Sequence, residues 1–122
     1  MAIKKEDRLL EVIKNGNLQM PVFLAEHYHE LGINNSEFLV LVQLFAFAQK
    51  GNYFPSLSIL STQLHIEQRE VEKNLSNLLT KKVIALNANN TEIDLSPIYS
   101  ANLKEVVINN DKVGDSRKEI LN

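Results

Sequence analysis

The side chains best suited to chemistry gather in the run EHYHE, from Glu26 to Glu30. Imidazole and carboxylate groups are metal ligands, but on a helix His27 and His29 point about 200° apart and cannot share one ion. Only Glu26 and Glu30 share a face, and paired surface acids are usually solvated. The chain has no cysteine and no GxxxxGK or GxSxG motif. We therefore expect no metal site, no cofactor and no catalysis.

The run HIEQREVEK holds the residues that could recognise DNA. If it opens the second helix of a helix-turn-helix, Gln68, Arg69 and Lys73 could read base edges. Between residues 67 and 77, however, three acids face two bases, for a local balance of −1. Residues 83–103 contain no lysine or arginine. Because neutralising phosphates supplies most of the non-specific affinity, we expect weak or no direct DNA binding.

Length and charge bound the class of protein. A chain of 122 residues with 44% hydrophobic content can bury one ordinary core. Its formal net charge of −2 gives no general attraction to nucleic acid or anionic lipid. The longest apolar run, FLVLVQLFAFA, is shorter than the ~20 residues that cross a bilayer. We expect a cytoplasmic protein without a membrane span, with one domain over residues 1–108 and a polar tail or linker over residues 109–122.

Glycine, proline and asparagine mark where the predicted helices of the first half begin and end. The run EDRLLEVIK is expected to form a helix that ends where Gly16 takes a left-handed conformation, and LQMP after it should be extended. Pro21 and Gly32 suit the first position and the C′ position of a helix of about three turns. Asn34 and Glu37 have the spacing of a capping box, which predicts the start of the long apolar helix.

The second half predicts a helix-turn-helix followed by a hairpin. NYFPS should be a short strand, Ser56 should cap the first helix, and Glu67 should be the N-cap of the second with Glu70 at its third position. VIAL and EIDL flank NANNT, whose asparagines tolerate a hairpin turn. PIYSANLKEVVI predicts one more helix, with Pro97 near its start and with Ile98, Leu103, Val106 and Val107 as candidate packing residues. The expected fold is mainly α, a winged helix with an N-terminal helix-strand-helix extension, a small β-hairpin and a C-terminal helix.

The N-terminal extension carries more apolar residues than so peripheral a segment should need. Apolar patches on soluble proteins usually find a partner, which predicts self-association. The alternative is that these residues merely cover the long helix. The candidate oligomerisation residues are Leu9, Leu10, Ile13, Leu18, Met20, Val22 and Phe23.

Two adjacent aromatic residues are the candidate anchors for a protein partner. Tyr53 and Phe54 lie in a segment expected to be extended, so their rings should point to opposite sides and at most one can enter the core. Leu86, late on the first hairpin strand, should lie near the same short sheet. The patch of Tyr53, Phe54 and Leu86 is therefore the predicted partner-binding surface.

Three stretches, HYHELGINNSE, KGNYFPS and SPIY, carry a resemblance to a known family. With the longer run from Val22 to Leu86, they resemble the N-terminal domain of DnaD-like primosomal replication-initiation proteins of Gram-positive bacteria. The resemblance implies a domain that forms dimers or tetramers and docks other initiation proteins, including the initiator DnaA. It also implies a second, C-terminal domain with most of the DNA binding, which is absent from this sequence.

Three functional readings follow. The first is a non-enzymatic scaffold that self-associates and docks replication-initiation proteins. The second is a winged-helix transcriptional regulator that binds duplex DNA as a dimer, which should have a basic wing that this chain lacks. The third is a small catalytic domain, for which no acid-base constellation is visible.

Overall fold

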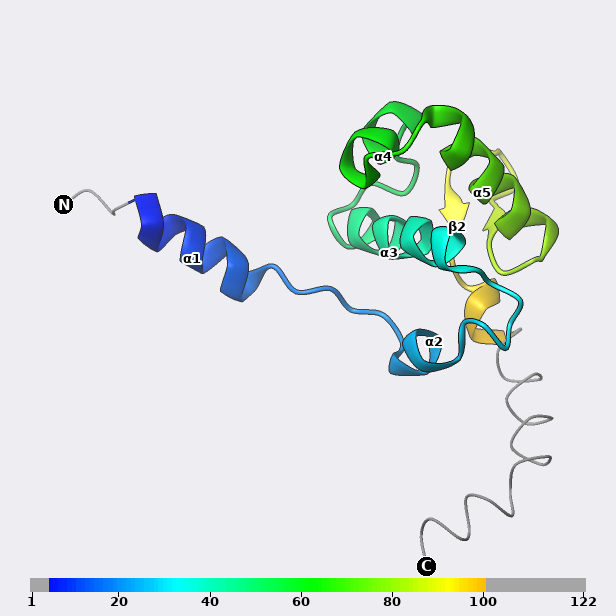
Figure 1. Cartoon of the computed structure of the whole chain (residues 1–122), viewed down its shortest axis with the longest axis horizontal. Helices are drawn as coiled ribbons and strands as arrows, with labels where there is room; N and C mark the ends of the chain where they lie inside the picture. The colour runs from blue at the N-terminus through cyan, green and yellow to red at the C-terminus, as the bar shows by residue number, and fades with distance from the viewer. Residues whose placement is uncertain (1–4, 101–122) are drawn as a thin grey trace, which may run out of the picture.

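The computed structural model describes residues 5–100, in which a helical body carries a two-stranded sheet and α1 stands apart (Figure 1). The elements are α1 (Lys5–Asn15), α2 (Val22–His27), α3 (Asn35–Gln49), α4 (Leu57–Leu64), α5 (Gln68–Thr80), β1 (Ala85–Leu86) and β2 (Ile93–Asp94). The backbone turns helical again over residues 97–100. The predicted mainly helical fold with a small hairpin is confirmed. The rest of the predicted last helix, with Leu103, Val106 and Val107, and the predicted tail lie outside the described residues.

Helix α3 is the centre of the core, and both α4 and α5 pack against it. Its capping box forms as predicted: the Asn34 side chain accepts from the Glu37 N–H at 2.8 Å, and Glu37 Oε1 accepts from the Asn34 N–H at 2.9 Å. Burying each large aliphatic side chain contributes about 1.5–3 kcal/mol. The buried hydrophobic residues are Leu24, Ile33, Val40, Leu41, Leu44, Phe45, Leu60, Val71, Leu78, Val83, Ile84, Ile93 and Ile98.

The two helices after α3 begin where the sequence predicts. The Ser56 hydroxyl caps α4 by accepting from the Ile59 N–H at 3.1 Å. Glu67 is the N-cap residue of α5, with Glu70 at the third helical position, but the Glu67 side chain makes no capping hydrogen bond. The charge of Glu67 therefore faces solvent beside the positive end of the helix dipole.

Helix α1 ends in the predicted NGN run, but the predicted cause of that end is wrong, and so is the predicted end of α2. Gly16 is not left-handed; its N–H continues α1 by donating to the Val12 carbonyl at 2.8 Å, and the positive-φ glycines of residues 5–100 are Gly32 and Gly51. Helix α2 ends at His27, well before Gly32. The chain between them makes tighter turns, in which the Gly32 N–H donates to the His29 carbonyl at 3.0 Å. Gly32, with φ of 79°, then reverses the chain as only glycine does without strain.

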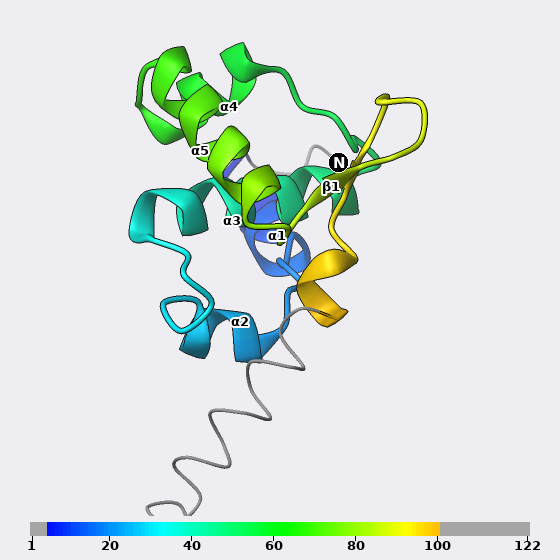
Figure 2. The same ribbon diagram turned by 90° about the vertical axis from the view of Figure 1, so that its right-hand side faces the viewer.

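The hairpin after α5 pairs Ala85 with Asp94 and Leu86 with Ile93, and Asn90 takes the predicted left-handed turn conformation. The hairpin stands beside α3 and α5, and the turn that begins at Pro97 lies at the same end of the body as α2 (Figures 1 and 2). NYFPS does not form the predicted short strand, because the chain bends at Tyr53 and Phe54, and the Phe54 N–H donates to Asn52 Oδ1 at 3.1 Å. LQMP has no regular secondary structure, so the strand expected in the N-terminal extension does not form within residues 5–100.

Candidate protein-docking surface

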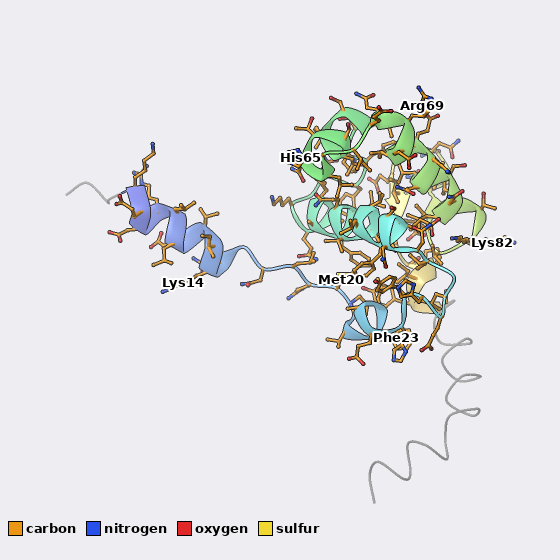
Figure 3. All side chains as sticks on the ribbon, viewed as in Figure 1. Lys14, Met20, Phe23, His65, Arg69 and Lys82 are labelled. Atoms are coloured by element: carbon orange, nitrogen blue, oxygen red, sulfur yellow. The ribbon has the colours of Figure 1, made fainter. Side chains whose placement is uncertain are left out.

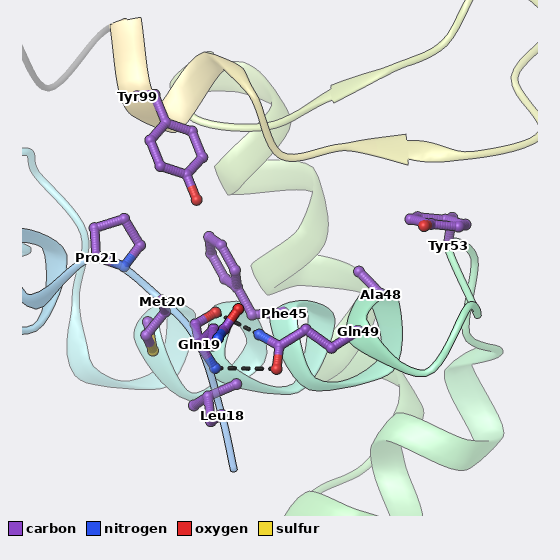
Figure 4. A pocket seen from close by; sticks show the side chains of 9 residues that line it. All are labelled: Leu18, Gln19, Met20, Pro21, Phe45, Ala48, Gln49, Tyr53 and Tyr99. Carbon is purple, nitrogen blue, oxygen red and sulfur yellow. Dashed lines mark hydrogen bonds between the residues drawn. The ribbon is translucent and has the colours of Figure 1, made fainter. Parts of the chain in front are cut away.

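An open groove of about 840 Å³ separates the segment from Leu18 to Pro21 from the C-terminal half of α3 (Figure 4). We call it the Tyr53 groove. Its lining residues are Leu18, Gln19, Met20, Pro21, Phe45, Ala48, Gln49, Tyr53 and Tyr99. None of these side chains is charged, and the Tyr99 ring points toward Phe45 across the groove. Such a surface favours an apolar ligand with a few hydrogen-bonding groups.

A single side chain holds one wall of the Tyr53 groove in place. The Gln19 N–H donates to Gln49 Oε1 at 3.0 Å, and Gln49 Nε2 donates back to the Gln19 carbonyl (Figure 4). The amide of Gln49 thus takes the place of a peptide group on a neighbouring strand. This pair explains why the segment is extended although no strand lies beside it within residues 5–100.

The other end of the groove meets the hairpin. The Tyr53 carbonyl accepts from the Ile93 N–H at 2.8 Å, which fixes residue 53 beside β2. A smaller hollow of about 280 Å³ adjoins the groove at Ala48 and Tyr53, and Glu92 and Asp94 are its charged lining residues. Hydrogen bonds from the Ser96 hydroxyl and N–H lower the pKa of Asp94, so this end of the surface is negatively charged at neutral pH.

The structure exposes all three predicted partner-binding residues. Tyr53, Phe54 and Leu86 are 48%, 49% and 39% exposed, so neither of the adjacent rings is buried. Tyr53 and Leu86 lie on either side of Ile93, because Ile93 is hydrogen-bonded to the first and paired with the second. Only Tyr53 lines the groove; Phe54 and Leu86 line neither hollow.

The predicted oligomerisation residues divide into two groups. Leu9, Leu10 and Ile13 lie on α1, which buries none of its residues. Val12, which the sequence reading missed although it lies three positions after Leu9, completes an α1 apolar stripe. The exposed fractions are 62% for Leu9, 49% for Leu10, 68% for Val12 and 63% for Ile13.

In the second group, from residue 18 to residue 23, some side chains are exposed and others pack against the body. Leu18 and Val22 are exposed, whereas Met20 packs against the core. Phe23 is half-buried and stacks on His27 with ring centroids 4.8 Å apart. Side chains of α1 therefore reach into solvent, while those near α2 partly join the body (Figure 3).

The candidate DNA-reading residues Gln68, Arg69 and Lys73 are exposed on α5. The three glutamates of HIEQREVEK are exposed beside them. Arg69 lies at the opposite end of the body from Phe23, so the candidate DNA-reading residues are far from the oligomerisation residues predicted on α2 (Figure 3). The N-terminus of α5 thus offers mixed charge rather than a basic surface, which disfavours phosphate binding.

The side chains of the EHYHE run make local contacts with one another. His27 Nδ1 lies 3.0 Å from Glu30 Oε1, and Nε2 lies 3.9 Å from Glu26 Oε2. The exposed His29 ring contacts Tyr28, with centroids 4.2 Å apart. In residues 5–100 no group of three or more potential ligands converges on one point. Over the same residues, no helix has the length and apolar composition that crossing a bilayer requires.

A buried ion pair was not predicted. The fully buried Glu37 accepts from Lys81 Nζ at 2.6 Å, and Lys81 Nζ also donates to the Gly32 carbonyl at 2.6 Å. Burial acts to raise the pKa of Glu37, but the Lys81 ammonium and the Asn34 N–H outweigh it and hold the pKa below its ordinary value. This pair joins the end of α5 to the start of α3 and to the turn after α2.

Comparisons with known proteins agree on one family. The model of the DnaD N-terminal domain matches residues 20–113. The chain is 27% identical over 77 residues to the replicative helicase loading/DNA remodeling protein DnaD of Bacillus subtilis (strain 168), over 63% of this chain and 33% of that protein. The chain thus spans about a third of the length of this relative. The fold is similar to the crystal structure of the N-terminal domain of DnaD from Geobacillus kaustophilus HTA426, with a TM-score of 0.78 and 22% identity over 93% of this chain and 99% of that one. The predicted resemblance is confirmed: this chain belongs to the DnaD N-terminal domain family.

Proposed function

We propose that this chain is a non-catalytic scaffold domain of DNA replication initiation, which self-associates and docks other initiation proteins. The B. subtilis relative is named a replicative helicase loading/DNA remodeling protein, which supports a role in replication. The observation that carries the proposal is the uncharged Tyr53 groove beside the exposed Phe54 and Leu86. Exposed aromatic residues beside an uncharged hollow are typical anchors of protein interfaces.

The arrangement of the body supports the same function. We interpret α3, α4, α5 and the hairpin as a winged helix in which the usual DNA-reading helix is α5. Exposed glutamates alternate with Arg69 and Lys73 on that helix, and the hairpin carries Glu92 and Asp94 without any basic residue. A regulator that binds duplex DNA needs cations at these two places. The charge therefore favours the use of this fold to bind proteins.

Self-association is assigned to the N-terminal extension, as a dimer or tetramer. The α1 apolar stripe together with Leu18 and Val22 leaves six large apolar side chains exposed within residues 5–22. Removing such a surface from water is the ordinary driving force of association.

The initiator DnaA is the proposed partner, from the family resemblance. Phe54→Ala, and less strongly Leu86→Ala, should weaken binding to DnaA at least about tenfold, ~1.4 kcal/mol. Both side chains are exposed, so the melting temperature should change little. Ile59→Ala on α4 is a matched control, because Ile59 is 42% exposed and Leu86 is 39% exposed. Anisotropy titrations with labelled DnaA test the proposal. Unchanged affinity in Phe54→Ala and Leu86→Ala, or a drop of several degrees in melting temperature, contradicts the assignment.

A further inference from the structure

The sequence holds a single Asn-Gly pair, Asn15 and Gly16, and the pair lies where α1 ends. In such a pair the glycine nitrogen can attack the asparagine side chain, because glycine has no Cβ to hinder the approach and its backbone reaches many conformations. We propose that Asn15 is a site of spontaneous modification, which the folded chain converts to aspartate and isoaspartate whenever the last turn of α1 opens. The inference does not depend on the proposed scaffold function.

The reaction consumes only water and releases only ammonia. The Gly16 nitrogen bonds to the carbonyl carbon of the Asn15 side chain, and the bond from that carbon to the amide nitrogen breaks. The amide nitrogen leaves as ammonia with the proton of the Gly16 N–H. Water then opens the resulting succinimide ring at either of its two carbonyl groups. One opening gives aspartate, and the other gives isoaspartate, whose backbone is longer by a methylene group.

Both residues of the pair are open to water. Asn15 and Gly16 are exposed, and both line an open hollow of about 840 Å³ bordered by the ends of α1 and α3. The Asn15 side chain makes no hydrogen bond within residues 5–100, whereas Asn17 Nδ2 donates to the Lys14 carbonyl at 2.9 Å. The Asn15 amide is therefore free to turn toward Gly16.

The closed end of α1 holds the reaction back. The Gly16 N–H donates to the Val12 carbonyl at 2.8 Å, so the attacking nitrogen is engaged while the last turn is formed. The helical backbone of Asn15 also keeps that nitrogen away from the side-chain carbonyl carbon. Attack therefore follows opening of the last turn, and a helix that buries none of its residues opens readily at its end.

The same turn explains why a glycine follows Asn15. A Cβ at position 16 would lie 2.8 Å from the Val12 carbonyl oxygen, closer than a Cβ comes to such an atom. A larger residue would slow the attack, but it could not close α1 in this way. The contact that ends the helix thus creates the labile pair.

Conversion of Asn15 prevents the turn from closing as before. A carboxylate at the C-terminal end of α1 meets the negative end of the helix dipole, which is unfavourable. In isoaspartate, the added methylene group also displaces the Gly16 N–H from the Val12 carbonyl. The modified chain therefore has a shorter α1 than the unmodified chain.

Peptide mapping of the intact chain, incubated at neutral pH, tests the site. Asn15 should convert before Asn89 and Asn90, which are exposed in the turn of the hairpin. Hydroxylamine, which cleaves the chain at a succinimide, should cut after residue 15, and Asn15→Gln should abolish this cut. Conversion of Asn89 or Asn90 as fast as that of Asn15 overturns the proposal.

Paired substitutions of Glu11 test the dependence on helix opening. Glu11 is exposed and lies one turn before Asn15, so Glu11→Gly and Glu11→Ala remove the same charge without altering the reacting groups. Glycine weakens a helix relative to alanine, so Asn15 should convert about fivefold faster in Glu11→Gly than in Glu11→Ala. In urea, where α1 is unfolded in both variants, the two rates should be equal. Equal rates in the folded variants overturn the proposal.

Discussion

Replacing Lys81 by methionine should destabilise the fold strongly, although Lys81 lies at a helix end. The Glu37 side chain is fully buried and that of Lys81 is 34% exposed, with 2.6 Å between Nζ and Oε1. Removing one partner of a buried pair costs about 3–5 kcal/mol, because the other charge stays buried. Since water partly screens Lys81, we expect a loss near the lower end, about 3 kcal/mol. For a domain of this size that lowers the melting temperature by roughly 12–24 °C.

The pH dependence should change sign. In the native chain the folded-state pKa of Glu37 is lowered, so its contribution is present above the ordinary carboxyl pKa and is lost as pH falls through the folded value. In Lys81→Met, the Asn34 N–H and the Asn77 side chain alone oppose burial, which is the largest single influence on Glu37, so the pKa of Glu37 should rise above its ordinary value. Protonating Glu37 then relieves the buried charge. The variant should therefore gain stability as pH falls from about 7 to about 5, while the native chain does not.

Urea denaturation of Lys81→Met at both pH values measures these effects. Lys82→Met is the control, because Lys82 is an exposed neighbour and surface substitutions usually change stability by less than about 0.5 kcal/mol. Glu37→Gln in the Lys81→Met background should restore part of the loss, since it removes the buried charge and keeps an acceptor for Asn34. A loss under about 1 kcal/mol, or the native sign of the pH slope, would refute the role given to Lys81.

Three further outcomes follow from the structure. The domain should bind duplex DNA no more tightly than ~10⁻⁴–10⁻⁶ M at physiological salt in fluorescence anisotropy, and nanomolar binding to one sequence would rule out the scaffold function. A chain lacking residues 1–20 should be a folded monomer in light scattering, whereas an unchanged oligomer would remove the extension from the interface. Gln49→Leu should lose both hydrogen bonds to Gln19, a cost of about 1–3 kcal/mol, and raise amide exchange at residues 17–20 without changing that of α4 and α5.

Local patterns in the sequence predicted most of the elements. The capping box of Asn34 and Glu37, the Ser56 cap and the asparagine turn of the hairpin each depend on residues within a few positions of one another. The length of α2 was overestimated because both Pro21 and Gly32 mark its ends, and neither shows that the chain between them tightens after His27.

Contacts between distant residues could not be predicted in the same way. Glu37 and Lys81 are 44 positions apart, and Gln19 and Gln49 are 30 positions apart. The local pattern predicts the cap that Glu37 makes with Asn34, but nothing in it pairs Glu37 with Lys81 or distinguishes Lys81, Gln19 and Gln49 from solvated residues. The Tyr53 groove has the same origin, since its wall at residues 18–21, its floor at Phe45 and its rim at Tyr99 meet only when the chain has folded. Tyr53, Leu18 and Met20 were predicted separately, for two different sites, and the structure places them in one.

The two hydrogen bonds between Gln49 and Gln19 affect how readily assemblies of this domain could exchange subunits. Two hydrogen bonds to one side chain contribute about 1–3 kcal/mol, whereas unfolding a whole domain costs about 5–15 kcal/mol. The N-terminal arm, residues 5–21, can therefore detach from α3 and reattach many times while α3, α4 and α5 stay folded. Complexes built through such an arm would exchange subunits on the timescale of local opening rather than of global unfolding. Two hydrogen bonds this weak would allow such complexes to come apart without denaturing their components.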